Sequence, residues 1–192
     1  MKHKNIIYIF TSIFLIICIV VLSTLITVKN NKKDDYGLIL GNVIEEEISL
    51  PNCNQSFASS FMSVSYLEKM IKNDASKIIN NKIVKLSKLI KDASYIIINI
   101  GVYDLCSNIK INETTNTLIY DEEVLKQKKQ IIISIVNTII NDIHTINQNL
   151  ILYLKNIDYN YKIHDYELIK IFNELNQSYK NLTNNYNIKT LN

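Results

Sequence analysis

The sequence has no arginine, no tryptophan, a single proline and only three glycines among its 192 residues. Its net charge of +3 is small and spread out, with lysines and acidic residues intermixed. Nucleic-acid-binding proteins usually cluster basic side chains and use arginine for bidentate contacts with phosphates. The composition therefore argues against a nucleic acid as partner.

Cysteine is also scarce, with Cys18, Cys53 and Cys106 as the only three. Three cysteines do not form a disulfide framework, and Cys18 lies in a long apolar run. Cys53 and Cys106 are expected just after strands on the same rim of a sheet. They could form a bridge in an oxidising compartment, although two free, half-buried thiols are the favoured interpretation. No Cys/His cluster has the spacing of metal ligands, so neither a metal nor another cofactor is expected.

The apolar run extends from Ile6 to Val28 without a charged residue, which is long enough to cross a bilayer, since a span takes about 20 residues. A secretory signal peptide would have a shorter apolar core and a small-residue cleavage site. We therefore predict an uncleaved, single-pass membrane anchor over residues 1–29 and a polar linker over 30–35. The domain over 36–192 is expected on the extracytoplasmic side of the cell membrane.

Two of the glycines end apolar runs, Gly41 after Tyr36–Leu40 and Gly101 after Tyr95–Ile100. A glycine at the tip of a buried strand usually allows a sharp turn or a close approach of two backbones. In open α/β sheets, ligands bind beyond the carboxyl ends of the strands. The sequence therefore predicts a pocket next to these two tips.

Strand-like and helix-like periods alternate through the rest of the domain. Strands are predicted at 36–40, 48–50, 95–100, 150–154 and 187–191. Helices are predicted from a capping box at Ser65–Glu68 through Ile79, over 83–90, over 121–147, and from about Asp165 through Leu182. This order predicts a three-layer α/β/α domain with a parallel, flavodoxin-like sheet.

The two strand tips resemble blocks of the SGNH (GDSL-type) hydrolase family, and the resemblance covers roughly residues 36 to 191. The first family block, Gly-Asp-Ser-Leu, corresponds to Gly41-Asn42-Val43-Ile44, and Gly-x-Asn-Asp corresponds to Gly101-Val102-Tyr103-Asp104. The segment 57–67 resembles the second block, with Phe61 in place of its glycine. Leu175-Asn176 and Tyr179 resemble the last helix of such domains. The resemblance implies an SGNH-type fold and an ancestral ester-hydrolase activity.

The departures from the family pattern decide the predicted chemistry. A serine hydrolase needs a nucleophilic oxygen, a base and donors directed at the oxyanion. Val43 stands where the family has its serine, Phe61 replaces a glycine, and Tyr103 replaces the asparagine of the oxyanion site. The family's Asp-x-x-His loop would follow the last strand, and the domain is expected to be C-terminally truncated before it. The sequence thus predicts an inactive member whose old pocket is plugged by these three side chains, with Asp104 as structural support.

Two alternatives remain open. An active lipase or acylesterase could use a displaced serine (Ser59, Ser60, Ser63 or Ser65) or a base from a partner chain, although Ser65 is expected to be a helix cap. The chain could also be a decayed reading frame without a selected function. His144 and His164 are expected at the surface rather than in catalysis.

Three further features are interpreted without a binding or catalytic role. Glu45–Glu47 is expected to be a solvated turn rather than a cation site. The tyrosines at 153, 159, 161 and 166 are expected to pack rather than to form a carbohydrate-stacking surface. The strand at 187–191 is expected to leave an open sheet edge through which the protein could self-associate.

Overall fold

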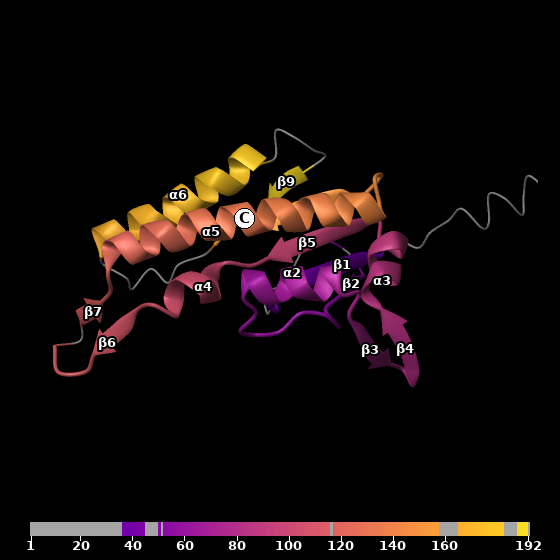
Figure 1. Ribbon diagram of the computed structural model, residues 1–192, viewed down its shortest axis with the longest axis horizontal. Coiled ribbons are helices and arrows are strands. Elements are labelled where there is room, and N and C mark those ends of the chain that lie inside the picture. The colour runs from indigo at the N-terminus through magenta and orange to yellow at the C-terminus, as the bar shows by residue number, and fades with distance from the viewer. Residues whose placement is uncertain are drawn as a thin grey trace, which may run out of the picture. The chain divides into compact units, whose positions relative to one another are not determined.

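The computed structural model describes residues 36–44, 50, 52–115, 117–157, 165–182 and 188–191 (Figure 1). The predicted anchor and linker lie outside these ranges, as do Glu45–Glu47 and His164. Within the described ranges, no helix is long and apolar enough to cross a bilayer.

The centre of the domain is a five-stranded parallel sheet with the order β2-β1-β5-β8-β9. Its strands are β1 (Gly37–Gly41), β2 (Cys53–Asn54), β5 (Tyr95–Asn99), β8 (Ile151–Lys155) and β9 (Ile188–Leu191). The parallel α/β sheet is as predicted. The second strand differs, because it lies at Cys53–Asn54, after Pro51, whereas residues 48–49 of the predicted strand are outside the described ranges.

The order of the strands reverses next to β1. The chain passes from β1 to β2 on one side and then to β5 on the other, and β1 pairs with β5 from Gly37↔Tyr95 to Gly41↔Asn99. Such a reversal is the topological switch point at which doubly wound sheets bind their ligands. The topology therefore predicts a ligand site at the carboxyl ends of β1 and β5.

Five helices accompany the sheet in the described chain: α2 (Val64–Lys72), α3 (Leu86–Asp92), α4 (Val102–Cys106), α5 (Glu122–Ile146) and α6 (Tyr166–Leu182). The two long helices, α5 and α6, lie close to their predicted ranges. The Asp121 carboxylate begins α5 by accepting hydrogen bonds from the amides of Glu123 and Val124, at 2.9 and 3.1 Å.

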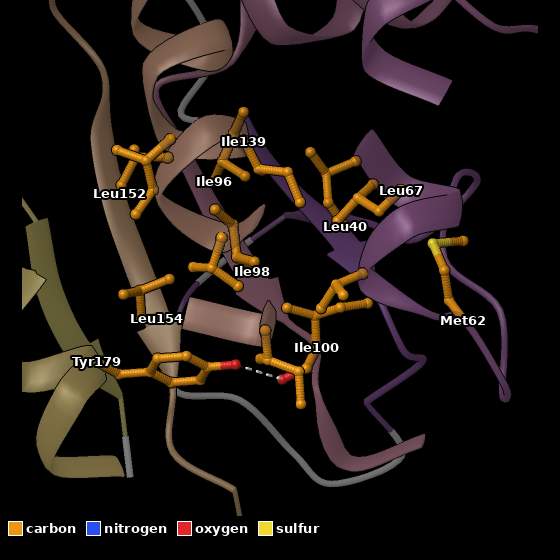
Figure 2. Close-up of a cluster of buried hydrophobic side chains, with 14 of the residues drawn as sticks. Leu40, Met62, Leu67, Ile96, Ile98, Ile100, Ile139, Leu152, Leu154 and Tyr179 are labelled. Atoms are coloured by element: carbon orange, nitrogen blue, oxygen red, sulfur yellow. Dashed lines mark hydrogen bonds between the residues drawn. The ribbon is translucent and has the colours of Figure 1, made fainter. Parts of the chain in front are cut away.

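The main core lies between one face of the sheet and these helices, as Figure 2 shows. It joins strand residues such as Leu40, Ile98 and Leu154 to Leu67 of α2 and Ile139 of α5. A second buried cluster, Ile39, Ile44, Tyr95 and Ile97, forms on the opposite face, and no member of it lies in a described helix. The predicted second helical layer is therefore not found among the described residues.

The first predicted helix is displaced at both ends. Helix α2 begins at Val64, and its N-cap is Ser63, whose Oγ accepts a hydrogen bond from the Tyr66 amide at 3.2 Å. Ser65 is an exposed residue inside the helix, so the predicted cap is wrong by two positions. The helix ends at Lys72, and Asp74 adopts a positive φ of 47° just beyond it, which a continuing α-helix does not allow.

The residues after α2 form a hairpin instead of more helix. Strands β3 (Ser76–Ile79) and β4 (Lys82–Lys85) pair antiparallel around Asn80 and Asn81, which both have positive φ, as tight hairpin turns require. The next helix, predicted from Ile83, consequently starts at Leu86. A second hairpin, β6 (Lys110–Asn112) with β7 (Thr117–Ile119), was not predicted, because strands of three residues leave almost no periodic pattern.

The two described cysteines are free and do not share a rim. Cys53 pairs in register with Gly37, the first residue of β1, whereas Cys106 lies in α4, beyond the carboxyl end of β5. A disulfide needs Cα atoms within about 7 Å, and these positions lie toward opposite ends of the strands. The expectation of a shared rim is therefore wrong.

Candidate functional site at the carboxyl ends of β1 and β5

A pocket of about 280 Å³ lies at the switch point of the sheet. Its lining comes from three segments: the turn after β1, the loop before α2, and the segment from the end of β5 through α4. The lining residues are Asn42, Ser60, Phe61, Asn99, Val102, Tyr103 and Cys106. The pocket thus lies where the glycines at the strand tips predict it.

The turn after β1 is bound tightly to the end of β5. Gly41 has a φ of +99°, and a Cβ atom there would lie 2.2 Å from the Asn99 carbonyl oxygen, so a glycine is required. The Asn42 amide donates to this same oxygen at 2.6 Å, and Asn99 Nδ2 donates to the Asn42 carbonyl at 3.2 Å. The two strand tips therefore form one rigid floor.

The loop before α2 is fixed to the same turn. Asn42 Oδ1 accepts a hydrogen bond from the Met62 amide at 2.9 Å, and the Ser59 amide donates to the Gly41 carbonyl at 2.9 Å. Among the hydrogen bonds of the described residues, these leave Asn42 Nδ2 and Asn99 Oδ1 as the side-chain groups of the floor that can bind a ligand. The loop brings Ser60 and Phe61 to the pocket wall.

The tip of β5 depends on a buried tyrosine of α6. The Tyr179 hydroxyl donates to the Ile100 carbonyl at 3.0 Å (Figure 2), and a Cβ atom at Gly101 would lie only 2.7 Å from this hydroxyl oxygen. Burial raises the pKa of Tyr179 far above its usual range, so the hydroxyl stays a donor. Asn176 makes two bonds to the Ile157 backbone after β8. The Asn and Tyr of the last helix thus anchor the segments that follow two neighbouring strands.

Asp104 fixes α4, which lines the pocket, to the start of α2. Its carboxylate accepts from the Val64 amide, the first residue of α2, at 3.1 Å to one oxygen and 3.3 Å to the other. Burial raises the pKa of this carboxyl above its ordinary value, although the bond from Val64 acts in the opposite direction. Asp104 therefore links α4 to the start of another helix.

Of the residues predicted for the site, Asn42, Phe61 and Tyr103 line one pocket. The rings of Phe61 and Tyr103 lie 6.1 Å apart between centroids, and their exposed fractions are 76% and 41%. Val43 is half-buried and, in the described part of the chain, does not belong to the lining. The prediction that Val43, Phe61 and Tyr103 plug the pocket is therefore wrong, because the two aromatic side chains form one of its walls and leave it open.

Three lining residues were not predicted: Asn99, Val102 and Cys106. Asn99 carried a signal, since it is the one polar residue in the apolar run from Ile96 to Ile100. Burial raises the pKa of the Cys106 thiol, so a smaller fraction of it is thiolate at a given pH than for an unperturbed cysteine.

The described part of the site contains a hydroxyl but no matching base. Ser60 is exposed at the pocket, whereas His144 lies in the last turn of α5. Nearby Asn147 donates to the Ile90 and Ala93 carbonyls, which precede β5, so this end of α5 lies at the amino end of the sheet. Burial lowers the pKa of His144, which is half-buried rather than fully solvated as predicted. In the described ranges, no three His, Cys, Asp or Glu side chains are grouped to hold a metal ion.

Neither a protein-family model nor a curated protein matches the chain. Among solved structures, a lipase from a goat rumen metagenome is similar, with a TM-score of 0.61 over 82% of this chain and 80% of that chain, at 17% sequence identity. This chain has the fold of that lipase. An acetyl xylan esterase from the rumen bacterium Butyrivibrio proteoclasticus is less similar, with a TM-score of 0.38 over 82% of this chain and 55% of that chain, at 10% identity.

The likeness to the lipase establishes an esterase/lipase-type α/β fold. At this level of identity it assigns no activity, because one fold hosts many functions and the residues of the site decide the chemistry. The activity of this protein therefore has to be inferred from the residues that line its pocket.

Proposed function

We propose that this protein is a membrane-anchored, extracytoplasmic domain of SGNH-hydrolase type that binds a small ligand and does not hydrolyse esters. The observation that carries the proposal is the aromatic pair Phe61 and Tyr103, which lines the pocket at the switch point. By the family resemblance, these two positions would supply oxyanion donors, and Val43 stands where the family has its nucleophilic serine.

The composition of the pocket supports binding of a ligand with an apolar part. Phe61, Val102, Tyr103 and Cys106 offer carbon and sulfur surface, while Asn42 and Asn99 offer amide groups at the floor. A mostly apolar cleft with a few placed polar groups is typical of small-molecule sites. A short acyl chain ending in a polar group matches this distribution.

The test of inactivity is an esterase assay on the detergent-solubilised full chain with short 4-nitrophenyl esters, compared with Ser60→Ala. We expect both proteins to release nitrophenol at the same background rate. Turnover that is lost in Ser60→Ala, while the circular dichroism spectrum is unchanged, would instead establish the displaced-serine hydrolase.

Binding has a separate readout in the rate at which iodoacetamide alkylates Cys106, with Cys53 as internal control. Hexanoate, used as the acyl probe, should slow alkylation at Cys106 and leave Cys53 unaffected, since Cys53 lies at the other end of β1. Phe61→Ala should weaken this protection. Equal rates at Cys106 with and without saturating probe would contradict an acyl ligand.

A further inference from the structure

The β3–β4 hairpin presents an apolar pair to solvent. Its register places Ile78 opposite Ile83, on the same face as Ser76 and Lys85, because side chains alternate between the two faces of a strand. The exposed fractions of Ile78 and Ile83 are 76% and 77%. Two adjacent isoleucines with most of their surface in water are costly unless another surface covers them.

The opposite face of the hairpin is fixed to the domain. Lys77 Nζ donates to the Ser56 carbonyl at 2.7 Å and lies 5.4 Å from the centroid of the Phe57 ring. Ile79 packs against the main core, and the Leu86 amide donates to the Ala75 carbonyl at the hairpin base. Because this face is held, the isoleucine pair stays directed outward, on a hairpin that extends away from α5 and α6 (Figure 1).

The hairpin and the helix that follows it have an excess of positive charge. Residues 74–92 contain five lysines and two aspartates, a net charge of +3 that equals the net charge of the whole chain. The two aspartates stand at the ends of the segment, where Asp74 pairs with Lys85 at 3.1 Å and Asp92 pairs with Lys88 at 2.5 Å. Lys85 lies on the same face as Ile83, whereas Lys82, opposite Ile79 in the register, lies on the other face beside the turn. The exposed apolar pair thus lies on a hairpin, residues 76–85, that contains three lysines and no acidic residue.

We propose that this hairpin docks on an anionic lipid bilayer, with Ile78 and Ile83 entering the interface and Lys82 and Lys85 reaching the headgroups from its two faces. Apolar side chains entering the interface while lysines remain at the headgroups is the arrangement by which peripheral segments bind membranes. A lipid surface fits better than a protein partner, because two side chains offer far less than the roughly 1,200 Å² buried in a stable protein interface. The inference concerns the hairpin alone and does not depend on the function proposed for the pocket.

The absence of tryptophan makes a direct test possible in the full chain. The variant Ile83→Trp places a single indole on the hairpin, and Ile131→Trp places one on α5, where Ile131 is also half exposed, as a matched control. Each variant is reconstituted in vesicles that contain brominated phosphatidylcholine, with or without phosphatidylglycerol. We expect loss of most of the Ile83→Trp emission in the anionic vesicles, little loss in the neutral ones, and none for Ile131→Trp.

A second variant examines the charge. Lys82→Glu in the Ile83→Trp background should restore the emission, since each lysine near an anionic surface contributes about a fivefold gain in affinity, whereas Lys110→Glu on the other hairpin should not. Quenching that is equal in neutral and anionic vesicles, or absent from both, would overturn the proposal. A blue shift that grows with protein concentration without any quenching would assign the face to a second copy of the chain and would also overturn it.

Discussion

Tyr179 shows how a single side chain can shape a pocket that it does not line. Its ring is completely buried in α6, and its hydroxyl holds the Ile100 carbonyl while occupying the space beside Gly101. Gly101 meets both requirements of this turn, since it adopts a positive φ and has no Cβ atom to collide with the tyrosine hydroxyl. The turn sets the direction of α4, which brings Val102, Tyr103 and Cys106 to the pocket.

At this scale we predict that Tyr179→Phe lowers the free energy of unfolding by about 1–3 kcal/mol, because the Ile100 carbonyl would remain buried without its donor. The measurement is urea denaturation of the full chain in detergent, followed by circular dichroism. Tyr166→Phe is the matched control, since Tyr166 lies on the same helix and is largely exposed. Equal stability of the two variants would contradict the role given to this hydrogen bond.

Helix α2 is the element on which the pocket wall depends most. Its start is held twice, by Ser63 through the Tyr66 amide and by Asp104 through the Val64 amide. Because Phe61 lies just before these caps, the position of its ring follows from where the helix begins. The capping serine is therefore a positioning residue for the aromatic wall.

We expect Ser63→Ala to destabilise the protein by about 1 kcal/mol, the usual cost of losing an N-cap side chain. Ser65→Ala serves as its control and should change stability by less than about 0.5 kcal/mol, as for other exposed substitutions. Thermal unfolding of the two variants side by side provides the comparison. A larger effect at Ser65 would restore the capping box that the sequence suggested.

At the scale of the whole molecule, the edge of the sheet at β9 bears on self-association. Strand β9 lies at the end of the described sheet and pairs there only with β8. Unpaired edge strands are templates for further strand pairing, and lysine on the edge is a common protection against it. Lys189 provides one such charge, with its Nζ atom 5.9 Å from the centroid of the Tyr153 ring.

We propose that the protein self-associates through this edge. Thr190→Glu should then lower the fraction of dimer seen by sedimentation of the full chain in detergent, because a second charge would oppose pairing of two β9 strands. Thr117→Glu, an equally polar change on β7, should leave it unchanged. A wild-type protein that sediments as a monomer at all concentrations would contradict the proposal.

The sequence by itself determined the strands β1, β5, β8 and β9 and the helices α5 and α6. Continuous apolar runs and a 3.6-residue stripe report directly on burial, and they need no knowledge of distant residues. It also placed the glycines that mark the strand tips, and hence the edge at which the pocket lies. The start of α2 was only approximate, since Ser63 and Ser65 offer similar caps and only packing selects between them.

The tertiary structure alone decided how the site is assembled. Its decisive relations are between residues about 40 or more positions apart in the chain. Phe61 lies against Tyr103, and Val64 donates to Asp104. Cys53 and Cys106, by contrast, lie apart as free thiols. Such contacts depend on how the crossover connections wind about the sheet, which no local period encodes. The hairpin at 76–85 is different, because its paired residues are at most nine positions apart. Its isoleucines match a helical period, but the turn at Asn80 and Asn81 pairs them as strands.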